Sequence, residues 1–266
     1  MSEPTIKVVS LGAGVQSTVL ALMGDQGAFG AKPDCAIFAD TQWEPIGVYE
    51  HLDWLEKELS YPVYRVTAGN LRNDALAMRP AKNKDGANFM PIPLFTEKGI
   101  GRRQCTYDYK MLPIRKKTRE LLGLKPNERS KTIFAETWIG ISQDEMQRIK
   151  DSGLRYIKNR WPLIEHKMHR YHCQKWFAER YPSRRLAKSA CIGCPYHNNA
   201  LWREMKKTDP VSWADAVSFD REIRDLAEEK QYVHFKKMPL EEVDLRNEED
   251  MGQLSFLDEC DGMCGV

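Results

Sequence analysis

The apolar pattern changes its period early in the chain. A β-branched apolar run over residues 6–9 stops at Gly12-Ala13-Gly14, and from Ser17 onward the apolar positions follow helical spacing. This pattern predicts a buried strand, a glycine turn and a helix N-terminus. Such a turn exposes several backbone N–H groups, and the helix dipole adds partial positive charge. The turn is therefore suited to bind the phosphates of a nucleotide.

Strand and helix patterns continue to alternate after this first unit. Further buried strands are predicted at residues 34–40, 61–66 and 131–139, and helices at 45–59 and 108–122. This alternation predicts an α/β fold with a doubly wound, mostly parallel sheet and helices on both faces. Residues 69–104 are rich in proline and glycine and are predicted to form a long loop. After the last strand, Ser142 and Glu145 have the spacing of a helix capping box.

From residue 160 onward the pattern becomes helical and irregular. We therefore divide the chain into a nucleotide-binding α/β domain (residues 1–160), a helical region with metal-ligand cysteines (161–240) and an acidic tail (241–266). The tail contains nine acidic residues and one basic residue, a net charge of −8, which leaves +10 for residues 1–240. A basic body suits a polyanionic partner or a phosphorylated substrate, although a solvated surface with a solubilising tail has the same balance.

The composition is typical of a globular protein, with 42% hydrophobic and 29% charged residues. No stretch approaches the roughly 20 apolar residues of a membrane span. The N-terminus lacks the basic and apolar regions of a signal peptide. We therefore expect a cytoplasmic protein with no membrane partner, whose cysteines are thiols, metal ligands or catalysts rather than structural disulfides.

The glycine turn differs from both common phosphate-binding loops. A Walker loop ends in Gly-Lys-Ser/Thr, where this chain has Val15-Gln16-Ser17. A dinucleotide-binding loop has a third glycine, where this chain has Ser17. Taken alone, the turn therefore also fits an ordinary corner between a strand and a helix.

The most informative cysteines lie in the sequence Cys191-Ile192-Gly193-Cys194-Pro195. A Cys-x-x-Cys pair can direct two sulfur atoms at one metal, and a following proline occurs in iron–sulfur binding runs. A redox dithiol is an alternative, but thioredoxin-type pairs belong to a small βαβ unit. Because a tetrahedral site takes four ligands, we expect Cys105 and Cys173 to complete the set. Four cysteines suit a four-iron four-sulfur cluster or zinc, and nearby histidines leave a mixed zinc site open.

Cys260 and Cys264 lie in the acidic tail. A mobile tail is poorly suited to a rigid metal site but well suited to a thiol that visits an active site. We expect one of these two cysteines to be the sulfur carrier or nucleophile. The neighbouring acids disfavour a thiolate, so the tail would have to dock beside basic residues to react. A disordered end with incidental cysteines is the alternative.

With these motifs in order, the chain resembles the phosphoadenosine-phosphosulfate reductase family, which belongs to the PP-loop ATP pyrophosphatases of the adenine-nucleotide α-hydrolase superfamily. The resemblance implies an adenine nucleotide at the glycine turn and chemistry on sulfur. The matching segments are residues 10–17 (the PP-loop), 38–41 (a second-strand Asp-Thr motif), 103–113 (Cys-x-x-x-x-Lys-x-x-Pro), 138–148 (a strand-to-helix motif), 161–163 and 191–195.

The chain departs from the family pattern in three places. ATP-using members read Ser-Gly-Gly-x-Asp-Ser in the loop, where this chain has Gly12 and Gln16 at the first Ser and the Asp. The C-terminal Glu-Cys-Gly-x-His of the reductases is partly matched by residues 259–262, and Cys264 is additional. The double cysteine of cluster-containing adenylyl-sulfate reductases is absent at 104–105, and Cys173 would supply the missing ligand.

Two sets of binding residues follow from the motifs and the resemblance. For the nucleotide we expect Ser10, Gly12, Gly14, Gln16, Ser17, Asp40, Thr41 and Gly140. For the substrate we expect Arg102, Arg103, Lys110, Arg115, Glu145 and Arg148. Arginine is favoured there because its guanidinium makes planar bidentate contacts with phosphate.

Three functions are open on this basis. The first is a sulfur-transfer enzyme that adenylates an acceptor, such as a nucleic acid, with ATP and Mg²⁺ and then inserts sulfur with the help of an iron–sulfur cluster. The second is a phosphoadenylyl-sulfate or adenylyl-sulfate reductase that releases sulfite and needs a thiol reductant protein. The third is a non-catalytic nucleotide- or nucleic-acid-binding module with structural zinc. The additional cysteines and the altered tail favour the first, which would need a protein that donates sulfur.

Overall fold

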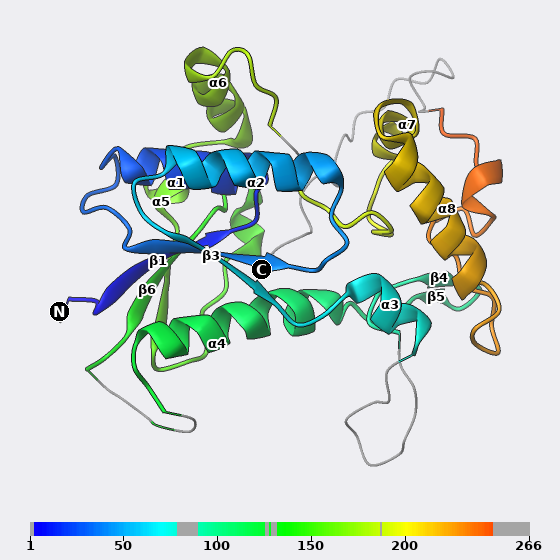
Figure 1. Cartoon of the computed structure of the whole chain (residues 1–266), viewed down its shortest axis with the longest axis horizontal. Coiled ribbons are helices and arrows are strands. Elements are labelled where there is room, and N and C mark those ends of the chain that lie inside the picture. The colour runs from blue at the N-terminus through cyan, green and yellow to red at the C-terminus, as the bar shows by residue number, and fades with distance from the viewer. Residues whose placement is uncertain (1–2, 79–89, 126–127, 129–131, 187, 247–266) are drawn as a thin grey trace.

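The computed structural model describes residues 3–78, 90–125, 128, 132–186 and 188–246. Its centre is a five-stranded sheet in which every neighbouring pair of strands is parallel, as the sequence predicted (Figure 1). The spatial order is β3-β2-β1-β6-β7. The strands are β1 (Ile6–Leu11), β2 (Cys35–Asp40), β3 (Val63–Thr67), β6 (Ala135–Ile139) and β7 (Ile157–Arg160).

The order of the strands creates a crevice at one edge of the sheet. From β1 the chain adds β2 and β3 on one side, and then crosses to add β6 and β7 on the other side. The loops that leave β1 and β6 therefore diverge over the carboxyl ends of two adjacent strands. In open α/β sheets, ligands bind in the crevice at such a switch point.

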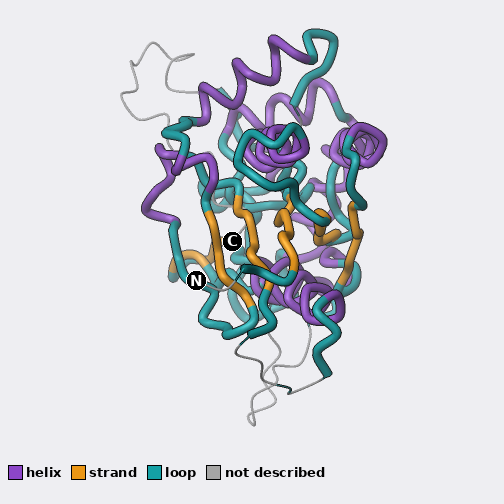
Figure 2. The backbone as a smooth tube through the Cα atoms, turned by 90° about the vertical axis from the view of Figure 1, so that its left-hand side faces the viewer, coloured by secondary structure: helices purple, strands orange, loops and turns teal. Residues whose placement is uncertain are grey.

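Helices cover both faces of the sheet, which Figure 2 shows as a layer of strands between layers of helices. On one face, Val9 and Phe38 pack in an apolar cluster with α1, α2 and α6. On the other face, Val8 and Ile37 pack in a second cluster with residues of α4 and of the turn that follows it. This alternation within β1 and β2 is the period of two that a strand requires. The helices are α1 (Val15–Asp25), α2 (Ile46–Glu58), α4 (Leu112–Leu121), α5 (Pro162–Glu165) and α6 (Arg170–Arg180).

A third apolar cluster lies to one side of the sheet, where Figure 1 shows α7 and α8 packed together. Trp202 and Phe219 are fully buried in it. The Asp220 carboxylate is also buried there and accepts hydrogen bonds from the backbone N–H groups of Val233 and Leu240, which anchors the chain after α8. The elements around this cluster are α3 (Leu71–Leu76), β4 (Phe95–Thr96), β5 (Gly99–Ile100), α7 (Asn199–Thr208) and α8 (Pro210–Ile223).

Several local predictions need correction. The segment 69–104 is not only a loop, because it contains α3 and the β4–β5 hairpin. The Asn70 side chain accepts a hydrogen bond from the Asn73 N–H and so starts α3, a signal that the glycine and proline content obscured. Strand β7 was not predicted. α1 begins at Val15 rather than Ser17, and a π-helix, Thr106–Met111, precedes α4.

The regions that we separated at residue 160 share one core. Leu163, Cys173 and Phe177, from α5 and α6, pack in the same apolar cluster as α1. Of the acidic tail, residues 247–266 lie outside the described residues. Among the helices that are described, none is long and apolar enough to cross a bilayer.

Candidate functional site at the carboxyl edge of the sheet

The glycine turn after β1 is held in shape by Ser17. The backbone N–H groups of Gly12 and Gly14 both donate to Ser17 Oγ, at 3.2 Å each. Between them, Ala13 has a φ of 53°, in the left-handed region that non-glycine residues rarely adopt. Such strained positions cluster at ligand-binding sites. The turn thus presents its backbone at the positively polarised end of α1.

Two neighbouring loops approach this turn closely. A Cβ atom at Gly140, in the loop after β6, would lie 2.8 Å from the N and Cα atoms of Ser17, so only glycine fits there. A Cβ atom at Gly14 would lie 3.6 Å from Cβ of Ser189, two residues before Cys191. Three segments therefore meet at one place: the glycine turn, the loop after β6, and the loop around residues 189–195 that contains the Cys-x-x-Cys motif, which we call the cysteine loop.

Gln16 is the centre of a buried polar cluster beside the turn. Its Nε2 donates to Glu145 Oε2 at 3.2 Å and to Ser142 Oγ at 3.3 Å, and its Oε1 accepts from Arg170 at 3.3 Å. Arg148 pairs with Glu145 at 2.8 Å. Burial raises the pKa of the Glu145 carboxyl, and the charge of Arg148 opposes this shift.

The predicted capping box at Ser142 is wrong. No side chain caps the short 3₁₀ helix Gln143–Arg148 that follows Ser142. The Glu145 carboxylate turns to Gln16 and Arg148 instead, because these partners satisfy a buried charge better than one backbone N–H would. The sequence spacing was thus correct for a cap, but the contact with Gln16, far away in sequence, decides the geometry.

Asp40 and Thr41, at the end of β2, have different surroundings. Asp40 Oδ1 accepts hydrogen bonds from the Gln42 N–H at 2.7 Å and from the Tyr49 hydroxyl at 2.9 Å. Burial, and then the hydrogen bond to Asp40, raise the pKa of Tyr49. Asp40 therefore shapes the turn after β2, and Thr41 faces the cysteine loop.

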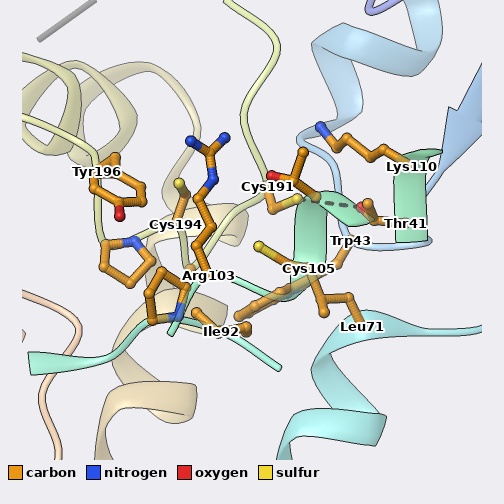
Figure 3. A pocket seen from close by; sticks show the side chains of 14 residues that line it. Thr41, Trp43, Leu71, Ile92, Arg103, Cys105, Lys110, Cys191, Cys194 and Tyr196 are labelled. Atoms are coloured by element: carbon orange, nitrogen blue, oxygen red, sulfur yellow. Dashed lines mark hydrogen bonds between the residues drawn. The ribbon is translucent and has the colours of Figure 1, made fainter. Parts of the chain in front are cut away.

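Three cysteines from two distant segments line one pocket (Figure 3). Cys105 precedes the π-helix, and Cys191 and Cys194 belong to the Cys-x-x-Cys loop. Figure 3 shows the three side chains around the same space, with the Arg103 guanidinium and the Lys110 ammonium group nearby. The structure thus brings Thr41, Arg103 and Lys110 together with three of the four predicted metal ligands.

Trp43 fixes the position of the cysteine loop. A Cβ atom at Gly193 would lie 2.2 Å from the Trp43 ring, so the indole packs directly on the glycine backbone. The Ile192 N–H donates to the Trp43 carbonyl at 2.9 Å. The indole Nε1 donates to Asp215 on α8 at 2.5 Å. The glycine inside the Cys-x-x-Cys motif is therefore explained by this close approach.

Cys191 lies among polar groups although it is buried. Its Sγ is 3.3 Å from Thr41 Oγ1 and donates to Glu44 Oε1 at 3.4 Å. Lys110 Nζ lies 3.6 Å from the same Glu44 oxygen. Within the described part of the chain, the other oxygen, Oε2, is buried and has no hydrogen-bond partner. A buried carboxylate of this kind is costly, which marks Glu44 as a functional candidate.

The fourth predicted ligand, Cys173, is not at this pocket. It lies on α6, fully buried in the apolar cluster between α6 and α1. Burial raises the pKa of its thiol to about 12. The prediction that Cys173 converges with the other three cysteines therefore needs correction, because α6 packs on α1 and buries this thiol among apolar side chains. In the described residues, no three His, Cys, Asp or Glu side chains form a group that could hold a metal ion.

The remaining predicted residues divide between several places. Arg102 is exposed, and Arg115 donates to the Ser152 carbonyl at 3.1 Å. Arg103 lies over the Tyr196 ring, with its guanidinium carbon 5.2 Å from the ring centroid. Ser10 lies within β1, between β2 and β6. Cys260 and Cys264 lie outside the described residues.

Sequence reasoning missed Glu44, Trp43, Arg170 and Ser189. Glu44 and Trp43 had one usable signal, since they follow directly after the Asp-Thr motif at the end of β2, where ligands of parallel sheets bind. The contacts of Arg170 and Ser189 depend on how α6 and the cysteine loop return to the sheet. No protein-family model matches the chain, and no curated protein matches it.

Proposed function

We propose that this chain is a sulfur-transfer enzyme of the PP-loop type. It would bind ATP at the glycine turn, adenylate an acceptor and replace the adenylate with sulfur. The observation that carries the proposal is the common location of two features: the turn with its helix N-terminus, and the pocket of three thiols. Ser189 of the cysteine loop lies against Gly14 of the turn. Thr41, at the end of β2, contacts the Cys191 thiol of the pocket.

In the proposed reaction, an oxygen of the acceptor attacks the α-phosphorus of ATP and pyrophosphate leaves. A sulfur nucleophile then attacks the activated carbon or phosphorus of the acceptor, and AMP leaves with the oxygen. The backbone N–H groups near the N-terminus of α1 would hold the phosphates. Arg148 and Arg170, which both contact the Gln16 cluster, would balance the charge of the pyrophosphate.

The pocket offers the donor type of an iron–sulfur cluster, but its three thiols would have to close on the cluster when it binds, because no three described His, Cys, Asp or Glu side chains form a metal-binding group as they stand. Thiolates are the usual ligands of such clusters, and Cys105, Cys191 and Cys194 would hold it. The cations of Arg103 and Lys110 beside the thiols favour the thiolate form and a negatively charged group. A bound cluster would supply a place for inorganic sulfur next to the adenylated acceptor. One tail thiol, Cys260 or Cys264, would carry the sulfur from a donor protein as a persulfide, whose outer sulfur attacks the adenylated acceptor. The other tail thiol would then attack the inner sulfur, which releases the thiolated acceptor and leaves a Cys260–Cys264 disulfide that a dithiol reductant reopens.

The test starts with protein purified without oxygen. We expect iron and acid-labile sulfide in the preparation, and formation of AMP and pyrophosphate from ATP that increases when an acceptor nucleic acid is added. Release of sulfite from adenylyl sulfate or phosphoadenylyl sulfate with a dithiol reductant would instead identify a reductase. Zinc without iron, together with no turnover of either nucleotide, would identify a binding module.

A glycine pair tests the nucleotide site. Gly140→Ala places a methyl group 2.8 Å from the backbone of Ser17, so we expect ATP affinity to fall at least about tenfold. Gly47→Ala is the matched control, because nothing lies within 4 Å of a Cβ atom there. Equal ATP affinity in the two variants, measured by calorimetry, would contradict the assignment of the glycine turn.

A further inference from the structure

The surface of α6 and its flanks has a strong excess of positive charge. Residues 166–185, which we call the α6 ridge, contain six basic residues and one acidic residue, Glu179. Arg170 turns inward to Gln16, and the other five cations are exposed. These five are Lys167, Lys175, Arg180, Arg184 and Arg185.

None of these five cations forms an ion pair with a carboxylate of the described residues. Some exposed arginines elsewhere are paired, as Arg221 is with Glu241 and Arg246 with Asp244. A helix that only needs solubility commonly mixes both signs of charge along its surface. The unpaired cations of the ridge therefore favour an anionic partner.

Aromatic rings lie between the cations of the ridge. Tyr171 is 65% exposed, although it is a large side chain. The Arg180 guanidinium lies over the Trp176 ring at 4.3 Å, and that of Arg184 lies over Trp54 of α2 at 4.5 Å. A shallow pocket also opens on the ridge, and its lining includes His166, Lys167, His172, Lys175, Trp176 and Glu179.

The ridge adjoins the candidate site at its N-terminal end. Arg170, the first residue of α6, donates to Gln16 beside the glycine turn, and the Arg170 N–H donates to Asp144 at 3.0 Å. Figure 1 shows α6 as the outermost helix on its face of the sheet. An extended polyanion lying along α6 would therefore reach the nucleotide site at one end.

We propose that the α6 ridge binds single-stranded nucleic acid, with the cations on the phosphates and the exposed Tyr171 ring stacked against an unpaired base. Cations that follow the nucleic-acid backbone, combined with an exposed aromatic ring on which a base stacks, are the recurring solution for this ligand. Stacking requires unpaired bases, so a duplex of the same length should bind more weakly. This inference rests on the proposed function for the identity of the strand, which would be the acceptor for sulfur.

The experiment measures binding without turnover. A fluorescein-labelled 20-nucleotide single strand of mixed sequence is titrated with the full chain between 50 and 200 mM salt, and anisotropy is recorded. The variant Lys175→Gln/Arg180→Gln/Arg184→Gln should bind at least about tenfold more weakly and lower the salt slope by up to about two, since each phosphate contact contributes roughly 0.7. The control Lys206→Gln/Lys207→Gln/Lys230→Gln, which removes three exposed lysines elsewhere, should bind like the unchanged protein.

Tyr171→Ala separates stacking from charge. It should weaken binding about 5- to 100-fold and leave the salt slope unchanged. Equal loss in the ridge and control variants, a duplex that binds as tightly as the single strand, or polyphosphate that competes as well as the single strand would each overturn the proposal. ATP binding of the ridge variant should match that of the unchanged protein, so failure here is distinguishable from failure of the proposed function.

Discussion

Two buried cysteines of this protein, Cys191 and Cys173, have opposite surroundings. Cys191 contacts a hydroxyl and a carboxylate, with a lysine close by. Cys173 packs with apolar side chains such as Phe177, in a cluster where its thiol has a pKa near 12. Both side chains are less than a tenth exposed, so burial does not distinguish them. The difference lies in the polar groups that the fold places around the sulfur.

This comparison teaches how a buried thiol can be assigned a role. A thiol among apolar groups behaves as a small hydrophobic side chain. The Cys191 thiol instead donates to a carboxylate, Glu44, that pairs with Lys110, so its proton has an acceptor and a cation lies in the same pocket. Loss of that proton gives the thiolate, which is the form that binds metals or attacks electrophiles. We therefore call the region around the cysteine loop, where we propose that the chemistry takes place, the reactive half of the molecule, and the region around α1 and α6 the packing half.

The largest expected effect comes from replacing the cysteines one at a time, which tests whether Cys173 differs in role from the three cysteines of the pocket. Cys105→Ala, Cys191→Ala and Cys194→Ala should each abolish bound iron, because each removes a donor from a set of three. Cys173→Ala should keep its iron and lose stability only, by about 1–3 kcal/mol for the cavity. Iron and sulfide analysis of anaerobically purified protein measures the first effect, and urea unfolding measures the second. Loss of iron from Cys173→Ala would contradict the comparison.

A second substitution tests whether the position of the cysteine loop matters. Gly193→Ala places a methyl group 2.2 Å from the Trp43 ring, so the loop or the indole must move. We expect iron content to fall by more than half, with a loss of about 1–3 kcal/mol of stability from overpacking. The difference between the tryptophan fluorescence spectra of Gly193→Ala and Gly47→Ala, recorded with and without Trp43→Phe because the chain has seven tryptophans, would report the movement of the ring. Unchanged iron in Gly193→Ala would show that the pocket does not depend on this contact.

Much of the fold could be predicted from the sequence. Short apolar runs and the glycine turn identified β1, β2, β3 and β6, because buried parallel strands are continuous apolar runs. Strand β7 could not be predicted in this way: it contains Lys158 and Arg160 and lies at the edge of the sheet, where one side of the strand is exposed. Local pattern therefore identified the three inner strands and the edge strand β3, and missed the other edge strand, β7.

The candidate site was predictable to a smaller extent. The spacing of Cys191 and Cys194 is local information, and the structure places both at one pocket with Cys105. The choice of Cys173 used proximity in sequence, and the packing of α6 on α1 overrode it. Glu44 was missed because its importance comes from Cys191, which is far away in sequence and reaches it only in the fold.

A substitution at Glu44 tests the reactive half through a single charge and should have a smaller effect than loss of a cysteine. Glu44→Gln keeps the shape of the side chain and removes the charge that Lys110 and the Cys191 thiol contact. Groups that contact metal ligands typically contribute 10- to 100-fold in metal affinity, and we expect the rate of iron loss to a chelator to change by a similar factor. The control Glu56→Gln, on the outer surface of α2, should leave that rate unchanged. Equal rates in both variants would restrict Glu44 to a structural role.

The smallest expected effect is on the pH dependence of stability, and it comes from His51, a buried histidine of the packing half. His51 hydrogen-bonds Thr18 at 2.9 Å and lies near the Phe177 ring, and burial lowers its pKa to about 4. In the unfolded chain its pKa is about 6.5, so between pH 6.5 and 4 the unfolded state binds the proton and the folded state does not. The contribution of His51 to the free energy of unfolding is therefore fully present above pH 6.5. It decreases by about 1–3 kcal/mol as the pH falls toward 4. His51→Gln removes this titration, so its melting temperature should fall less between pH 7 and pH 4.5 than that of the unchanged protein. The exposed His172→Gln serves as the control and should follow the unchanged protein. If the melting temperature of His51→Gln falls as much as that of the unchanged protein, protonation of His51 is not the cause of the loss of stability in acid.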